Sequence, residues 1–174
     1  AENANVRNRF SMGNGWRTNY HQRIIALSSS DYVWEDGDGT RHEFHMTSSD
    51  VFLDKDGLNL TLRKSANDYT LTDKYGNTST FNSQGRLIRQ TDNQKIPSSV
   101  VITYEDSKLT EISDGVGRKY SFTYANGLLD KITYYGTGDT ALYEVEYDYV
   151  GTELTEIFYQ DGKVAYFAYT DKSL

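Results

Sequence analysis

A glycine recurs along the chain about every twenty residues, and a large apolar residue follows it five positions later. The pairs are Gly39 with Phe44, Gly57 with Leu62, Gly76 with Phe81, Gly117 with Phe122, Gly138 with Tyr143 and Gly162 with Phe167. An aspartate stands three residues before four of these glycines, as Asp36, Asp54, Asp73 and Asp114. Lys95 takes the glycine position in one degenerate unit. The seven anchors are therefore spaced by 18, 19, 19, 22, 21 and 24 residues, which predicts a repeat architecture.

The residues between successive anchors alternate as β-strands do. Tyr120, Phe122 and Tyr124 alternate with small polar residues, which is the two-residue period of a strand. The dipeptide Asn126-Gly127 follows, and it favours a tight hairpin turn because both residues can adopt positive φ. The Asp-x-x-Gly segments are typical of the opposite turn, where the carboxylate accepts a hydrogen bond from the backbone two residues on. Each unit is thus predicted to be one β-hairpin that stacks on the next.

A second motif interleaves with the first in the C-terminal half: a tyrosine, a leucine five residues later and an isoleucine eight residues later. Its copies begin at Tyr104, Tyr124 and Tyr149. Leu129 and Ile132 of the clearest copy lie three residues apart, so on a regular strand they would face opposite sides of the sheet. A β-bulge, a twist or burial on both faces would reconcile them.

Composition narrows the classes of function. The 174 residues include 15 tyrosines and 14 glycines but one proline, which is typical of short strands joined by tight turns. With 18 basic and 25 acidic residues the net charge is −7, so we expect neither nucleic acid nor a membrane as a partner. Zero cysteines exclude disulfides, cysteine-ligated zinc and thiol catalysis.

These patterns predict an all-β fold in which stacked antiparallel hairpins form one continuous twisted sheet. We expect residues 1–35 to form a lead-in segment and residues 36–174 to form a single domain of hairpin repeats. The residues given a structural role in the repeat are Gly39, Gly57, Gly76, Gly117, Gly162, Asp36, Asp54, Asp73, Asp114, Phe44, Phe81, Phe122, Tyr124, Gly127, Leu129 and Ile132.

The combination of Tyr-x-Tyr-x-x-Gly-x-Leu-x-x-Ile with Asp-x-x-Gly-Arg turns resembles the YD repeats of Rhs proteins. The residues that carry the resemblance are Phe122, Tyr124, Gly127, Leu129, Ile132, Asp114, Gly117, Arg118, Gly85, Arg86 and Leu87. The segment Gly13-Asn14-Gly15-Trp16 is similar to the start of an Rhs core. Relatives in that family include wall-associated proteins of Gram-positive bacteria, polymorphic toxins, insecticidal toxin-complex components and animal teneurins.

The resemblance implies a β-ribbon that spirals into a hollow shell, which in toxins encloses a C-terminal effector. Seven hairpins are too few to close a large shell, so it implies an N-terminal section of a longer one. The implied function is a structural scaffold in a secreted or cell-surface bacterial protein, and the implied partner is the remainder of that polypeptide. The alternative is a binding module for cell-wall carbohydrate or a surface protein.

Other residues invite a chemical interpretation, but each has a simpler one. His42 and His45 lie three apart and would face opposite sides of a strand, which does not suit a shared metal. Asp-x-Asp-Gly at 36–39 and 54–57 lacks the spacing of a calcium loop and coincides with the repeat's turns. Glu144 and Glu146 share a strand face, as solvated acids often do. We therefore assign no catalytic residue, no cofactor and no metal, and expect no enzymatic activity.

Two surface features complete the predictions. Tyrosines on alternate positions would stack on sugar rings if exposed, although strand pairing explains them more simply. The C-terminal segment 164–169 is apolar, β-prone and uncharged, and no proline protects it. Such an edge is a template for pairing with another chain, so we predict self-association through it.

Overall fold

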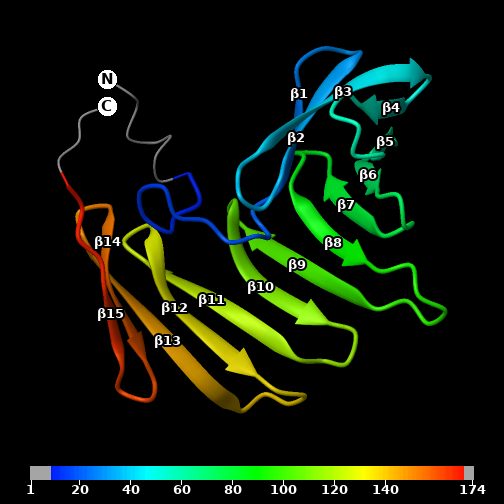
Figure 1. The fold of residues 1–174 in the computed structure, drawn as a ribbon. Helices are drawn as coiled ribbons and strands as arrows, with labels where there is room; N and C mark the ends of the chain where they lie inside the picture. Colours follow the sequence, from blue (N-terminus) through cyan, green and yellow to red (C-terminus); the bar gives the residue numbers. More distant parts are fainter. Residues whose placement is uncertain (1–8, 171–174) are drawn as a thin grey trace. The chain divides into compact units, whose positions relative to one another are not determined.

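The structure, a computed structural model, describes residues 9–170, and all its regular structure is β-strand (Figure 1). Strands β1 to β15 form one antiparallel sheet in which the order of strands is their order in the chain, which confirms the all-β prediction. The strands are β1 (Arg23–Ala26), β2 (Asp31–Glu35), β3 (Arg41–Ser48), β4 (Val51–Asp54), β5 (Thr61–Lys64), β6 (Asp68–Thr72), β7 (Thr78–Asn82), β8 (Leu87–Thr91), β9 (Ser99–Glu105), β10 (Lys108–Asp114), β11 (Lys119–Ala125), β12 (Leu128–Tyr135), β13 (Ala141–Val150), β14 (Glu153–Tyr159) and β15 (Val164–Tyr166). Within residues 9–170 we find no helix that is long and apolar enough to span a membrane.

All seven anchor positions lie at turns, and always at the turn that leads from an even-numbered strand to the next odd-numbered one. Five anchor glycines have φ between 74° and 97°, as the Asp-x-x-Gly pattern predicts, namely Gly39, Gly57, Gly76, Gly117 and Gly162. The opposite turn at Asn126-Gly127 has φ of 51° and 83° at its two residues. Both positions require left-handed backbone, which explains the choice of asparagine and glycine.

A β-bulge resolves the spacing of the second motif. The pairing between β11 and β12 shifts between Thr123 and Tyr124, so that Tyr124 faces Leu129 while Phe122 faces Ile132. Directly opposed residues point to the same side of a sheet, so Leu129 and Ile132 share a face despite their odd spacing. The pairing between β13 and β14 shifts in the same way before Tyr149.

The chain forms two compact units. Unit 1 contains residues 9–16, 104–112 and 116–170 of the described chain, and unit 2 contains residues 17–103 and 113–115. The lead-in predicted over residues 1–35 includes strands: β1 and β2 lie within it, and β2 pairs with β3 through five residues. Residues 1–8 lie outside the described part.

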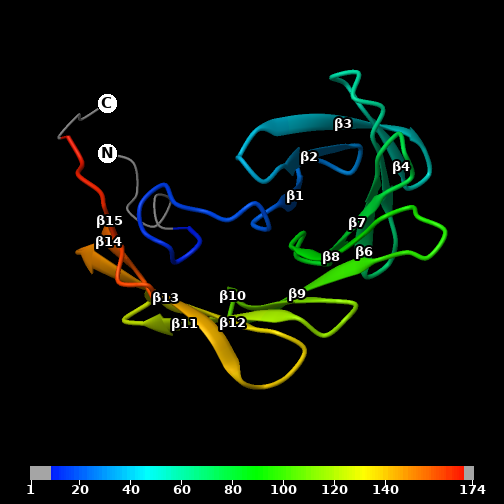
Figure 2. The ribbon, with the colours of Figure 1, turned by 60° about the horizontal axis from the view of Figure 1, so that its bottom comes forward.

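In unit 2 the sheet curls until its first strand meets its eighth (Figure 2). An isolated antiparallel bridge joins Arg23 to Arg86, the Ile24 amide donates to the Gly85 carbonyl at 2.8 Å, and the Leu87 amide donates to the Gln22 carbonyl at 3.4 Å. A Cβ at Gly85 would lie 2.0 Å from the Ile24 carbonyl oxygen. The strand crossing therefore requires glycine at this position.

The concave side of this curled sheet holds the apolar core of unit 2. Phe44, Phe52 and Phe81 are fully buried, and the Tyr32 ring meets the Phe52 ring edge-on at 4.7 Å. Phe44 and Phe81 are repeat residues five positions after an anchor, so the repeat places one large side chain from each hairpin into the interior. Burial of such side chains contributes about 1.5–3 kcal/mol each to folding.

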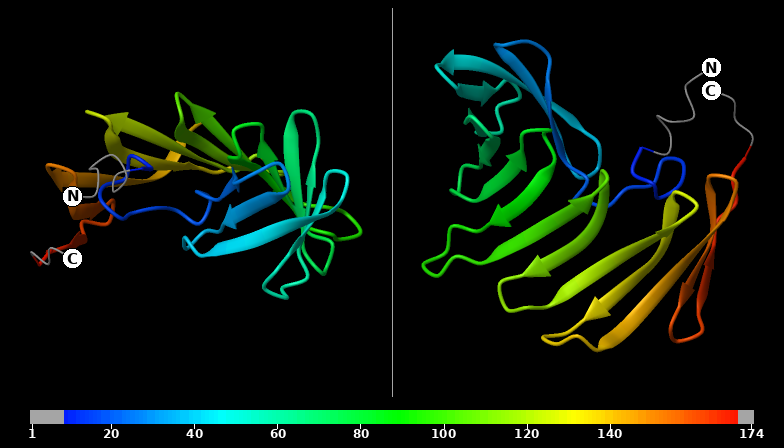
Figure 3. Two further views of the ribbon diagram at one scale, coloured as in Figure 1. Left: turned by 90° about the horizontal axis from the view of Figure 1, so that it is seen from above. Right: turned by 180° about the vertical axis from the view of Figure 1, so that it is seen from behind.

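In unit 1 the segment 9–16 crosses the ends of the C-terminal hairpins (Figures 1 and 3). The Asn14 amide donates to the Thr152 carbonyl at 2.8 Å, and the Leu129 amide donates to the Ser11 carbonyl. Trp16 packs edge-on against Phe167 at 4.8 Å and donates from Nε1 to the Tyr169 hydroxyl at 2.9 Å. The N-terminal segment thus fastens hairpins that follow it by more than a hundred residues.

Candidate functional site

The aspartates of the repeat cap its turns with their carboxylates. Oδ1 of Asp36 accepts the amides of Asp38, Gly39 and Thr40 at 3.0–3.1 Å. Oδ1 of Asp73 accepts the amides of Tyr75 and Asn77 at 2.8 and 2.9 Å. Both oxygens of Asp54 accept amides of its turn, those of Leu58 and Leu60. These bonds are the turn chemistry that the sequence predicts for the Asp-x-x-Gly segments.

The apolar residues of the repeat form the interior. Phe44, Phe81 and Leu129 are fully buried and Phe122 is 6% exposed, whereas Ile132 is half-buried. The Tyr124 hydroxyl donates to the Leu109 carbonyl at 2.8 Å. Burial, and to a smaller degree the neighbouring Tyr104, raises the pKa of Tyr124 to about 12. The repeat residues are therefore occupied by turns and packing in both units.

The structure places His42 and His45 on β3 with different partners. His42 lies between Asp36 and Asp56, at 3.2 and 3.1 Å, and His45 contacts Asp31 at 2.9 Å. The hydrogen bonds of His45, Ser30 and Ser28 lower the pKa of the Asp31 carboxyl. Within residues 9–170 no group of three or more His, Cys, Asp or Glu side chains is arranged to hold a metal ion.

Glu144 and Glu146 share one partner. Nζ of Lys131 lies 3.1 Å from the first carboxylate and 3.0 Å from the second. Hydrogen bonds from Lys131 and Thr133 lower the pKa of Glu144. A general acid of a glycosidase requires a raised pKa, so the electrostatics of this pair favour an ion-pair cluster.

A cavity of about 520 Å³ opens on the concave side of unit 2 and is the strongest candidate for a binding site. Its size lies within the ~300–1,000 Å³ typical of small-molecule sites. The lining residues come from five strands (β2, β6, β7, β8 and β9) and from adjoining turns, and they are Gln22, Trp34, Leu60, Leu71, Asp73, Asn77, Thr78, Ser79, Gln90, Thr91, Asp92, Ser98 and Val100.

The cavity exists because the side chains that point inward from β7 and β8 are apolar at one end of the strand pair and polar further along it. At one level the opposed residues Phe81 and Leu87 fill the interior completely. One step along the same face, the opposed residues are Ser79 and Gln90, which are polar and leave the space open. Sequence reasoning missed this signal. Ser79 and Gln90 are polar, although they occupy positions at which the alternation of each strand points the side chain inward.

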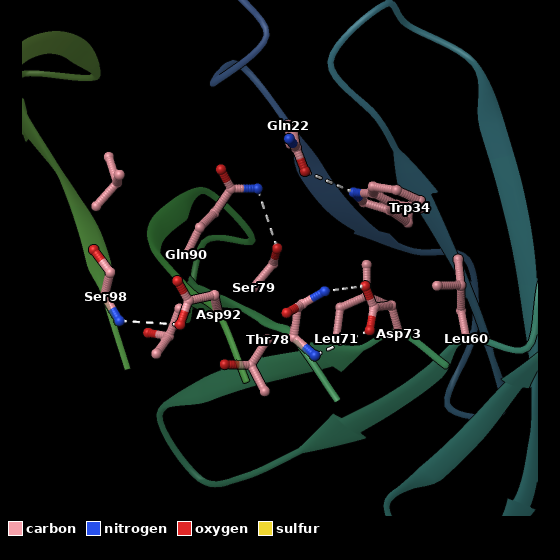
Figure 4. A pocket seen from close by; sticks show the side chains of 13 residues that line it. Gln22, Trp34, Leu60, Leu71, Asp73, Thr78, Ser79, Gln90, Asp92 and Ser98 are labelled. Carbon is pink, nitrogen blue, oxygen red and sulfur yellow. Dashed lines mark hydrogen bonds between the residues drawn. The ribbon is translucent and has the colours of Figure 1, made fainter. Parts of the chain in front are cut away.

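Hydrogen bonds hold the polar side chains of the cavity in place (Figure 4). Trp34 Nε1 donates to Gln22 Oε1 at 3.2 Å, and Gln90 Nε2 donates to Ser79 Oγ at 3.3 Å. Figure 4 shows Gln22 and Trp34 on one side of the space and Ser79 on the other. The His42 ring stacks on the Trp34 indole with 5.0 Å between centroids and 31° between planes.

Two carboxylates, those of Asp73 and Asp92, belong to the lining. Burial alone would raise the pKa of Asp73, but hydrogen bonds from the Asn77 side chain and from turn amides outweigh it and hold the pKa below its ordinary value. Asp92 accepts the amides of Gln94 and Ser98. Among the described residues that line the cavity none is a lysine, arginine or histidine, so no lining side chain neutralises these two carboxylates.

Sequence reasoning also missed a buried ionic cluster beside the β2–β3 turn of unit 2. Glu35 is 2% exposed, and its carboxylate lies 3.1 Å from Arg17 and 3.4 Å from Arg41. Arg17 also donates to the Asp36 carbonyl at 2.8 Å. A buried carboxylate needs such partners, and here they tie the lead-in to the β2–β3 turn.

No family model matches this sequence, and no curated protein matches it at a significant level. The resemblance to YD repeats therefore stays a prediction that rests on the motif residues themselves.

Proposed function

We propose that the chain is a structural scaffold, a segment of an Rhs-type β-shell in a larger secreted or cell-surface bacterial protein. In that role the remainder of the polypeptide is the partner, and a C-terminal effector is the cargo of the complete shell. The observation that best supports the proposal is that the recurring residues have structural roles in turns and in the apolar interior. Aspartates cap turns and large apolar residues fill the interior.

The hydrogen bonding of the sheet suits a scaffold that grows by adding hairpins. Strands of the sheet follow chain order, so each hairpin supplies the edge on which the next one pairs. Strand β15 pairs with β14 through Val164, Ala165 and Tyr166, and it is the last strand in the order. No strand within residues 9–170 pairs with the outer edge of β15, so a further strand could pair there.

The proposal is tested in the organism that carries this sequence. An antibody raised against the purified chain is used on denaturing gels of surface and culture fractions, with and without protease treatment of intact cells. We expect a protease-sensitive species much larger than the 174-residue chain, whose peptides extend the Gly and Tyr repeat beyond residue 174. A species no larger than this chain, or one confined to the cell interior, would contradict the scaffold role.

A further inference from the structure

We propose that the cavity of unit 2 is a binding site for a neutral saccharide. This inference goes beyond the scaffold role, because it rests on the lining of one cavity, to which the turn-capping Asp73 of the repeat also contributes. It departs from the tyrosine-based interpretation of the sequence by placing the site in unit 2, around Trp34.

The indole of Trp34 supplies a flat apolar surface beside the polar side chains that line the cavity. Sugar rings present C–H groups on one face, and amphipathic aromatic rings are suited to pack against such mixed surfaces. The hydrogen bond to Gln22 and the stacked His42 ring fix the orientation of this indole before any ligand binds. A preoriented side chain loses little entropy on binding, which favours affinity.

Uncharged hydrogen-bonding groups line much of the remaining surface. Two glutamines and an asparagine offer amides, and Thr78, Ser79, Thr91 and Ser98 offer hydroxyls. Amides and hydroxyls both donate and accept hydrogen bonds, as each sugar hydroxyl does. The two glutamines already hydrogen-bond to other side chains or to the backbone, and a ligand with many hydroxyls can use the donor and acceptor capacity that remains on the lining.

The charge of the lining selects against acidic ligands. Asp73 and Asp92 contribute two carboxylates, and the lining holds no cationic side chain. The two carboxylates accept hydrogen bonds from sugar hydroxyls but repel phosphate, sulfate or uronate groups. The lowered pKa of Asp73 favours its ionised form, and an ionised carboxylate is suited to accept hydrogen bonds from hydroxyl groups rather than to act as a general acid.

The test is a titration of the isotope-labelled 174-residue chain, followed by NMR chemical shifts. The probes are the neutral disaccharides cellobiose and N,N′-diacetylchitobiose up to about 20 mM, a range that detects millimolar affinity. Glucuronic acid serves as the acidic comparison. We expect saturable shifts for at least one neutral probe at the side-chain amides of Gln22 and Gln90 and at the indole N–H of Trp34, and none for glucuronic acid.

Variants locate the site. Gln90→Ala is expected to weaken binding of the neutral probe at least tenfold, since Gln90 lines the cavity and its side-chain amide is held there by Ser79. Tyr120→Ala is the matched control, because Tyr120 is a 46% exposed aromatic residue of unit 1. Each variant is first checked for a native spectrum, and Ser79→Ala replaces Gln90→Ala if that variant does not fold.

Each other outcome overturns the proposal. Absence of shifts with both disaccharides shows that the cavity takes no neutral sugar of this size. Shifts centred on Tyr120 and its neighbours assign sugar binding to the tyrosine rows of unit 1. Tighter binding of glucuronic acid refutes the charge argument, and saturable binding of an unrelated apolar probe such as indole alone assigns the cavity to another ligand class.

Discussion

Substitution of Gly85 by alanine tests whether the β1–β8 crossing holds unit 2 together. The added Cβ would lie 2.0 Å from the Ile24 carbonyl oxygen, a backbone atom that cannot rotate away. The φ of 77° adds the cost of left-handed backbone for a residue with a side chain. We compare it with Gly117→Ala, because Gly117 has φ of 86° and open space around its Cβ position.

Both substitutions carry the cost of left-handed backbone, but only Gly85→Ala also carries the cost of a clash with backbone. Left-handed backbone costs alanine about 1–2 kcal/mol at either site. Relief of the clash at Gly85 separates the crossing strands and removes the hydrogen bonds of the Ile24 and Leu87 amides, each worth about 0.5–1.5 kcal/mol. Gly117→Ala is therefore expected to destabilise the protein by about 1–2 kcal/mol, and Gly85→Ala by about 2–5 kcal/mol.

Urea denaturation gives the free energy of unfolding of each variant. Hydrogen exchange then assigns the cause, since the amides of Ile24 and Leu87 are expected to lose protection in Gly85→Ala and to keep it in Gly117→Ala. Equal free energies for the two variants, or unchanged protection of Ile24, would refute the claim that the crossing stabilises unit 2.

Three further perturbations follow from the structure. Tyr124→Phe should destabilise the protein by about 1–2 kcal/mol in urea denaturation, because it removes the hydroxyl that donates to the Leu109 carbonyl. Tyr149→Phe should have a much smaller effect, because among residues 9–170 the Tyr149 hydroxyl has no hydrogen-bond partner. The pKa of Asp73 is lower in the folded than in the unfolded chain, so its contribution to stability is present above the unfolded value of 3.8 and is lost as the pH falls below it. Asp73→Asn should therefore flatten the decline of the urea midpoint on acidification below about pH 4, and an unchanged decline would contradict this assignment. The chain should self-associate through segment 164–169, of which residues 164–166 form β15. Tyr166→Lys with Ala168→Lys should reduce the sedimentation coefficient at high concentration, and a monomeric wild-type chain would contradict the open edge.

The sequence by itself determined the hairpins, their turns and their stacking order. Asp-x-x-Gly and Asn126-Gly127 specify turns through hydrogen bonds and φ angles that lie within a few residues of one another. The alternation of Tyr120, Phe122 and Tyr124 then determines which face is apolar. Because each hairpin pairs with its neighbours in the chain, this local information was sufficient to predict the all-β sheet.

Where the local pattern allowed several backbone geometries, the tertiary structure determined which one forms. Leu129 and Ile132 permitted a bulge, a twist or burial on both faces, and the shifted pairing of β11 with β12 selected the bulge. The choice depends on the partner strand, which the motif does not contain.

Only the tertiary structure revealed the contacts between distant segments and the cavity. Gly85 lies more than fifty residues from Ile24, and Trp16 more than a hundred from Tyr169, so neither contact leaves a periodic signal in the sequence. The cavity depends on the curl of the sheet, which brings Gln22 and Trp34 opposite Ser79. Curvature accumulates over many strands from small twists, and no local motif specifies where the first strand meets the eighth.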